Sequence, residues 1–115
     1  MHITGINGRS GPILGLLDTG ADSTALPIGF ASLMGYSAAS LTSMIVGTAG
    51  SPVNAFRATQ DSTANVIGIQ GMPIALRPVF TPGTSASVLW GRSDLMSHFD
   101  IMFSERRQTF ELAWN

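Results

Sequence analysis

Short apolar stretches separated by turn-forming residues run along the whole chain. Thirteen glycines and six prolines are spread through the sequence, so most apolar stretches are shorter than a typical helix. This distribution is typical of short strands joined by turns, and it predicts an all-β fold. The strands predicted before the C-terminal segment span residues 3–6, 12–17, 43–46, 53–58, 66–69, 74–79 and 87–90.

Glycine-containing turns join several of these predicted strands. Residues 47–52 read Gly-Thr-Ala-Gly-Ser-Pro and lie between two strands, which predicts a hairpin over approximately residues 43–58. Residues 70–73 read Gln-Gly-Met-Pro and predict a second hairpin, between strands 66–69 and 74–79.

The C-terminal segment alternates apolar and polar residues in two runs separated by a polar turn at 104–108. The apolar positions are Phe99, Ile101 and Phe103 in the first run and Phe110, Leu112 and Trp114 in the second. A period of two places the apolar residues of each run on one face of a strand. Two further strands are therefore predicted here.

One short C-terminal helix is predicted over residues 93–99. Ser93 is a capping residue type, and Asp94 carries a negative charge that suits a helix N-terminus. Residues 26–36 are ambiguous and are compatible with one helical turn that ends at Gly35.

Length and composition predict one domain, residues 1–115, with a surface that meets a partner. Charged residues make up only 11% of the chain, hydrophobic residues make up 44%, and the mean hydropathy is +0.27. A small solitary domain needs more polar surface than this composition supplies. The net charge of −1 and the absence of lysine argue against a nucleic-acid partner, which usually selects a basic surface.

Metal, thiol and membrane chemistry find little support in the sequence. There is no cysteine, and His2 and His98 have no second ligand at the spacing of a metal site, so neither a metal nor another cofactor is predicted. No apolar run approaches the roughly 18 residues of a membrane helix, and no signal peptide is visible at Met1. The sequence leaves the cellular compartment open.

Asp18 stands apart from the other six carboxylates. Asp61, Asp100, Glu105 and Glu111 lie in polar or alternating contexts typical of solvated positions. Asp18 instead ends an apolar strand and is followed directly by a turn, where a carboxylate is costly unless it is hydrogen-bonded or functional. The ordinary interpretation is an aspartate that caps its own loop. The tripeptide Asp-Thr-Gly alone occurs by chance in about one such chain in twenty.

The longer string Leu-Leu-Asp-Thr-Gly-Ala-Asp-Ser-Thr, residues 16–24, is far more specific. It closely resembles the active-site segment of the retropepsins, the retroviral-type aspartic proteases. Val-Leu-Trp-Gly-Arg at 88–92, leading into the predicted helix, resembles the second element of that family, and the hairpin between the two falls where the family has its flap. The likeness is strongest over residues 13–27 and 88–103. It implies a closed β-barrel domain that forms one half of a C2 dimer.

The resemblance assigns roles to particular residues. Asp18 would be the catalytic aspartate, Thr19 would brace the loop against the other subunit, and Gly20 would present its carbonyl to the substrate backbone. The substrate-binding set would comprise Ala21, Asp22, Thr48, Ala49 and Leu89, with Thr48 and Ala49 at the flap tip. Asp22 would also pair with Arg92.

Three positions depart from the family pattern. Trp90 is bulky before Gly91, Ser93 replaces the Asn or Asp often found after the arginine, and the flap lacks the usual glycine-rich tip. Substrate preference therefore does not carry over.

The implied function is an aspartic endopeptidase that hydrolyses polypeptides and needs a homodimer, because the chain supplies one Asp-Thr-Gly and the chemistry needs two carboxylates. The alternative is the same fold kept as a peptide-binding or dimerisation module with weak or no turnover. A third interpretation is a noncatalytic β-domain with an accidental Asp-Thr-Gly. A metal site at Asp18 and Asp22 is disfavoured because further ligands are lacking.

Overall fold

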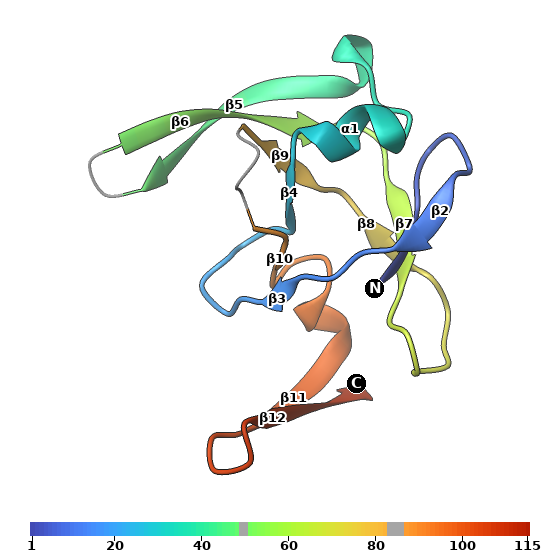
Figure 1. The fold of residues 1–115 in the computed structure, drawn as a ribbon, viewed down its shortest axis with the longest axis vertical. Coiled ribbons are helices and arrows are strands. Elements are labelled where there is room, and N and C mark those ends of the chain that lie inside the picture. The colour runs from blue at the N-terminus through green and yellow to red at the C-terminus, as the bar shows by residue number, and fades with distance from the viewer. Residues whose placement is uncertain (49–50, 83–86) are drawn as a thin grey trace.

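The computed structural model describes residues 1–48, 51–82 and 87–115, and the strands in this part of the chain form three sheets (Figure 1). Strands predominate, which confirms the all-β prediction. The elements are β1 His2–Thr4, β2 Ser10–Pro12, β3 Leu16–Leu17, β4 Ala25–Pro27, α1 Gly29–Leu33, the 3₁₀ helix η1 Ala38–Ser40, β5 Leu41–Thr48, β6 Ser51–Ala58, β7 Ser62–Asn65, β8 Ile74–Leu76, β9 Val79–Thr81, β10 Leu89–Trp90, the 3₁₀ helix η2 Met96–His98, β11 Phe99–Ser104 and β12 Thr109–Trp114.

A six-stranded sheet with the order β3-β10-β4-β9-β6-β5 forms the centre of the fold. β3 runs parallel to β10 and β4 runs parallel to β9, while the other neighbours are antiparallel. One residue from each strand falls in a single row of directly paired positions, which we call the paired row. In strand order the paired row is Leu16, Leu89, Ala25, Val79, Arg57 and Thr42. Paired residues project from the same face of a sheet, so the row forms one continuous strip.

The core lies between this sheet and a four-stranded sheet with the order β2-β1-β7-β8. Leu26, Leu76 and Phe80 are fully buried in it. The ring of Tyr36 packs 5.3 Å from that of Phe80, and its hydroxyl shares a 2.7 Å hydrogen bond with the Ser62 hydroxyl. Burial raises the pKa of the Tyr36 phenol above its ordinary value. The described pairings leave both sheets open, so the closed barrel remains a prediction.

Helix is scarce and short. In the described residues the one α-helix is α1, inside the ambiguous stretch 26–36. The helix predicted over 93–99 is reduced to turns followed by η2, and no side chain caps it. Asp94 bonds to Thr24 instead of serving the helix start, and β11 begins at Phe99 before an α-helix can develop. No helix in the described ranges is long and apolar enough to cross a membrane.

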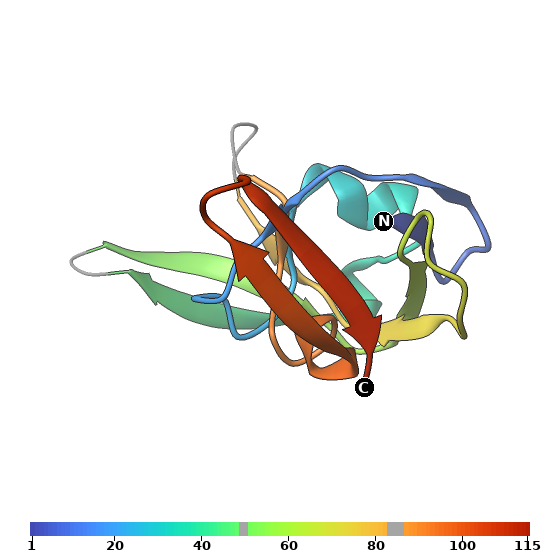
Figure 2. The same cartoon turned by 90° about the horizontal axis from the view of Figure 1, so that it is seen from below.

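The two predicted internal hairpins have different outcomes. β5 and β6 pair antiparallel from Leu41↔Ala58 to Thr48↔Ser51, which confirms the hairpin predicted over 43–58; it projects from the body of the molecule (Figure 2). The second hairpin pairs β7 with β8, and residues 66–69 form a turn instead of the predicted strand. The sequence misplaced this strand because β7 is polar and its buried residues, Ser62 and Ala64, are small.

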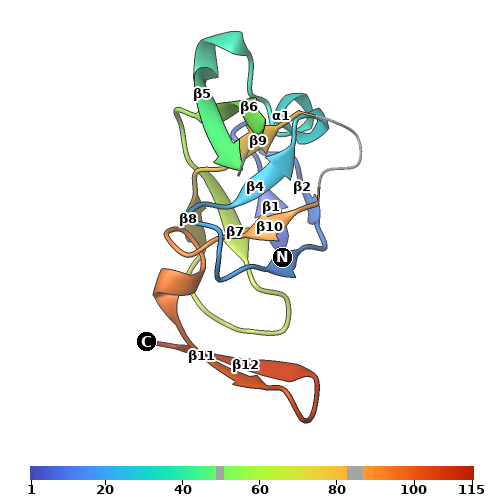
Figure 3. The same cartoon turned by 90° about the vertical axis from the view of Figure 1, so that its left-hand side faces the viewer.

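The third sheet is a hairpin of β11 and β12, set at one end of the molecule (Figure 3). Its pairs Phe99↔Trp114, Ile101↔Leu112 and Phe103↔Phe110 place the predicted apolar positions together, and we call these six residues the apolar hairpin face. The exposure of this face is greatest at the Phe103–Phe110 pair. Phe99 is buried and Ile101 and Leu112 are half-buried, whereas Phe103 is 56% and Phe110 50% exposed.

Candidate active site

Asp18 lies in a tight turn directly after β3. Its backbone N–H donates to the carbonyl of Trp90, 3.1 Å away, because β3 runs parallel to β10. Its Oδ1 accepts a 2.8 Å hydrogen bond from the N–H of Gly20, and its carbonyl accepts one from the N–H of Ala21 at 3.1 Å. Within the described residues, Oδ2 has no hydrogen-bond partner. Asp18 therefore holds its own loop with one carboxylate oxygen and keeps the other available.

Trp90, a departure from the family pattern, fits because of Gly15. The Trp90 side chain is buried, and a Cβ added to Gly15 would lie 2.7 Å from its indole nitrogen. The missing side chain at position 15 therefore makes room for the indole beneath the strand that leads to Asp18. Bulk at position 90 does not obstruct the loop.

Residues 91–94 are tied to the loop that carries Asp18. The N–H of Arg92 donates to the Ala21 carbonyl and the N–H of Ser93 donates to the Asp22 carbonyl, both at 2.9 Å. Gly91 passes so close to Ser23 that an added Cβ would meet three of its backbone atoms at 2.7 Å or less. Such an approach is open only to glycine.

We expect Gly91→Ala to lower the free energy of unfolding by about 3 kcal/mol, because the methyl group would push two backbone segments apart. Urea unfolding measures this loss. Gly11→Ala is the matched control, since an added Cβ there has no neighbour within 4 Å, and its cost should stay within about 0.5 kcal/mol. Equal unfolding midpoints for the two variants would contradict the close approach.

The side chains of Asp22 and Arg92 form an ion pair across this junction. The pair is exposed in the single chain, at 87% for the Asp22 side chain and 57% for Arg92. An exposed pair is screened by solvent and contributes little to stability.

We expect Arg92→Ala to lower the free energy of unfolding of the isolated chain by no more than about 1 kcal/mol, because the backbone bonds of residue 92 remain. Arg77→Ala is the control, since Arg77 pairs with Asp61 at 2.9 Å with comparable exposure. Thermal melts at low and high salt should show similar small losses of stability for the two variants. A loss of several kcal/mol for Arg92→Ala alone would show that the surface interpretation is wrong.

Thr24 and Asp94 form a second junction, which the sequence did not predict. The Asp94 Oδ1 accepts from the Thr24 hydroxyl at 2.7 Å and from the Thr24 N–H at 3.2 Å. The Thr24 hydroxyl in turn accepts from the N–H of Gly91 at 3.2 Å. Thr24 is fully buried, so this contact fixes the end of the Asp18 loop from inside the fold.

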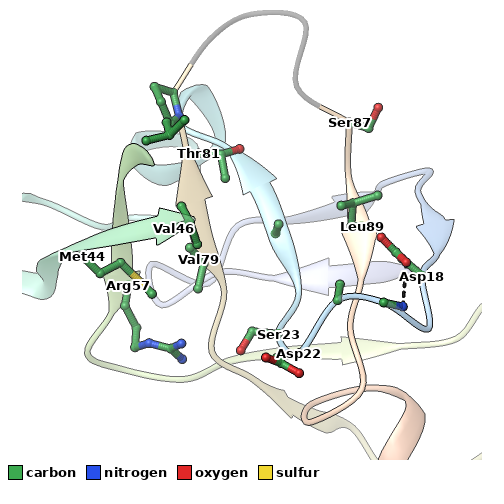
Figure 4. Close-up of a pocket in the computed structure, with 15 residues that line it drawn as sticks. Asp18, Asp22, Ser23, Met44, Val46, Arg57, Val79, Thr81, Ser87 and Leu89 are labelled. Atoms are coloured by element: carbon green, nitrogen blue, oxygen red, sulfur yellow. Dashed lines mark hydrogen bonds between the residues drawn. The ribbon is translucent and has the colours of Figure 1, made fainter. Parts of the chain in front are cut away.

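A cleft of about 630 Å³ opens between this loop and the β5–β6 hairpin (Figure 4). Five of the predicted site residues line it: Asp18, Gly20, Ala21, Asp22 and Leu89. The residues that the sequence did not identify are Ser23, Ala25, Met44, Val46, Val53, Arg57, Val79, Thr81, Pro82 and Ser87. Alternation in the predicted hairpin was an available signal, since Val53 and Arg57 share one face of β6.

The remaining predicted residues lie elsewhere. Thr19 is exposed beside the cleft and is not part of its lining. Thr48 ends β5 opposite Ser51, and Ala49 falls outside the described residues.

In the single chain the cleft is a largely apolar groove with two carboxylates at its wall, those of Asp18 and Asp22, and Asp22 is paired with Arg92. In the described ranges, no group of three or more His, Cys, Asp or Glu side chains is arranged to hold a metal ion. One carboxylate can accept or donate a proton, but it cannot serve as acid and base for the same step.

Comparison with known proteins agrees with the geometry. Residues 2–102 match the family model described as retroviral aspartyl protease, which covers nearly the whole chain. No match was found among curated proteins or among solved structures. The matched range includes both the Asp18 loop and the segment 91–94 that is bonded to it. This chain belongs to the retroviral aspartyl protease family.

Proposed function

We propose that the protein is an aspartic endopeptidase that hydrolyses polypeptides as a C2 homodimer, with Asp18 from each copy in the active site. The observation that carries the proposal is the position of Asp18. It lies in a glycine turn at the wall of an apolar cleft, with one carboxylate oxygen held by the loop, in a chain that belongs to the aspartyl protease family.

The chemistry follows from two carboxylates that share one proton. Two like charges a few Å apart cannot both ionise cheaply, so the pair holds a single proton. The ionised carboxylate removes a proton from water while the water oxygen attacks the peptide carbonyl carbon, and the other carboxylate gives its proton to the carbonyl oxygen. Proton transfer to the amide nitrogen then breaks the C–N bond and releases an amine and a carboxylic acid.

The need for a second copy rests on two features of the chain. It carries one Asp-Thr-Gly, and in the proposal a second copy of the chain supplies the other aspartate. The apolar hairpin face is half exposed at Phe103 and Phe110, and such an aromatic surface is suited to association. A C2 arrangement would use this same face on both copies.

Substrate binding in the proposal uses the cleft. Gly20, Ala21 and Asp22 would contact the substrate main chain from one side, and Leu89 would contact a side chain. The β5–β6 hairpin would close over the substrate as the flap, with Thr48 and Ala49 at its tip. The apolar side chains of Met44, Val46 and Val53 line the cleft from this hairpin.

The decisive experiment measures peptide turnover as a function of protein concentration. Cleavage of a peptide library should be inhibited by a pepstatin-type compound, and specific activity should fall faster than linearly on dilution through the dimer dissociation range. Sedimentation at the same concentrations gives the dimer fraction. Activity from a monomeric species would overturn the proposal, and peptide binding without turnover would support the binding module instead.

A further inference from the structure

Arg57 is a cationic side chain in the wall of the cleft. It extends from β6 toward the side of the cleft where Asp22 and Ser23 lie, and Figure 4 shows it across the cleft from Asp18. Its neighbours in the paired row are Thr42 and Val79, and neither can neutralise its charge. The guanidinium is therefore presented to whatever occupies this side of the cleft.

The nearby carboxylates of the cleft are already engaged. Asp22 pairs with Arg92, and Asp18 lies on the opposite side of the cleft, where it accepts from Gly20. In residues 1–48, 51–82 and 87–115, Arg57 has no ion-pair or hydrogen-bond partner for its side chain, whereas Arg77 and Arg92 each pair with an aspartate. A half-buried guanidinium in an apolar groove favours an anionic partner that can accept from several of its N–H groups.

The paired row gives the position of Arg57 relative to the reacting centre. Four consecutive members of the row, Leu89, Ala25, Val79 and Arg57, line the cleft. Leu89 adjoins the Asp18 loop, because the carbonyl of the next residue, Trp90, accepts a hydrogen bond from the backbone N–H of Asp18. Neighbouring strands lie about 4.8 Å apart, so three steps along the row span about 14 Å, the length of about four residues of extended peptide.

We propose that Arg57 is a specificity-determining residue that selects substrates with an aspartate or glutamate side chain about four residues from the scissile bond. The inference rests on the proposed peptidase function. In a C2 homodimer each copy supplies one Arg57, so the acidic preference falls on both sides of the scissile bond.

The test compares peptides that differ at one position. A cleavable peptide is rebuilt with Glu, Gln or Lys at each position outward from the scissile bond, and kcat/KM is measured for each. We expect one position on each side where Glu exceeds Gln by about tenfold and Lys is poorest, with the preference reduced by salt. If the wild-type protein gives equal kcat/KM values for the Glu, Gln and Lys peptides at every position, the proposal is overturned without any variant.

Variants then assign the preference to Arg57. Arg57→Gln should reduce the Glu-to-Gln ratio to about one, and Arg57→Glu should favour the Lys peptide. Arg77→Gln removes one exposed positive charge outside the cleft and should keep the wild-type ratio. An equal loss for all peptides in Arg57→Gln would mean that Arg57 contacts the substrate main chain, which would also overturn the proposal.

A binding measurement separates this proposal from the peptidase proposal. Fluorescence anisotropy of labelled Glu and Gln peptides on Asp18→Asn protein reports affinity without turnover, and we expect the Glu peptide to bind about tenfold more tightly. If the Glu peptide binds more tightly than the Gln peptide but the wild-type protein cleaves neither, the role of Arg57 stands and the peptidase proposal is rejected. If the wild-type protein cleaves peptides but shows no preference for Glu over Gln, the peptidase proposal stands and the role of Arg57 is rejected.

Discussion

Asp18→Asn should lower kcat by about a thousandfold or more while leaving the fold intact. The substitution keeps the size of the side chain, and its amide oxygen can still accept the hydrogen bond from Gly20 that Asp18 accepts at 2.8 Å. What is lost is a group that can exchange a proton with water and with the peptide carbonyl. Single-turnover cleavage of the best library peptide measures the loss, and circular dichroism with thermal melting reports the fold.

Asp100→Asn is the matched control for this prediction. Asp100 is an exposed aspartate on β11, outside the cleft, so the same chemical change there should leave kcat within about twofold of the wild type. If Asp18→Asn cleaves at the rate of this control, Asp18 is not catalytic. If it instead unfolds with little change in the activity of the folded fraction, the loop-capping interpretation of Asp18 is correct.

Phe103→Asp should raise the dimer dissociation constant by about a hundredfold and abolish turnover at concentrations where the wild type is dimeric. Phe103 lies opposite Phe110 on the apolar hairpin face, with ring centroids 6.1 Å apart, and both rings are half exposed in the single chain. A carboxylate placed there is tolerated by the monomer, where water reaches it, but not in an apolar interface. Sedimentation velocity and peptide turnover on the same samples measure the two effects.

Leu33→Asp provides the comparison for the hairpin. Leu33 is 53% exposed on α1, at the other end of the molecule from β11 and β12 (Figure 1), so the substitution has a similar cost in the monomer. Its dimer dissociation constant should match the wild type. Equal dimer dissociation constants for Phe103→Asp and Leu33→Asp would show that the hairpin is not the dimer surface.

The sequence predicted the parts of the site that are contiguous along the chain. Residues 16–24 and 88–92 are short strings in which each residue type has a local reason, and the structure places both at one junction. The alternation at 99–114 likewise predicted which residues of the last hairpin share a face. Local periodicity and turn formation depend on neighbouring residues, so they can be recognised in a single sequence.

Features that depend on distant pairing could not be predicted in this way. Asp94 was read as a helix-start charge because its neighbours allow that role, yet its carboxylate bonds to Thr24, 70 residues away. The residues next to Asp94 do not distinguish a carboxylate at a helix start from one that bonds to a residue far along the chain. Alternation along β6 placed Arg57 on the same face as Val53, but which face lines the cleft follows from the register of β6 with β9.

The long separation in sequence between the two halves of the Asp18 junction also constrains when the Asp18 loop can fold. Trp90, Arg92 and Ser93 supply backbone contacts that hold the loop, and the ribosome makes all three well after Asp18. A growing chain that has already presented Asp18 still lacks the segment that organises the loop around it, and such distant contacts form only once the intervening chain has been made. The loop that carries Asp18 therefore takes up its folded geometry only after residues 90–93 have left the ribosome.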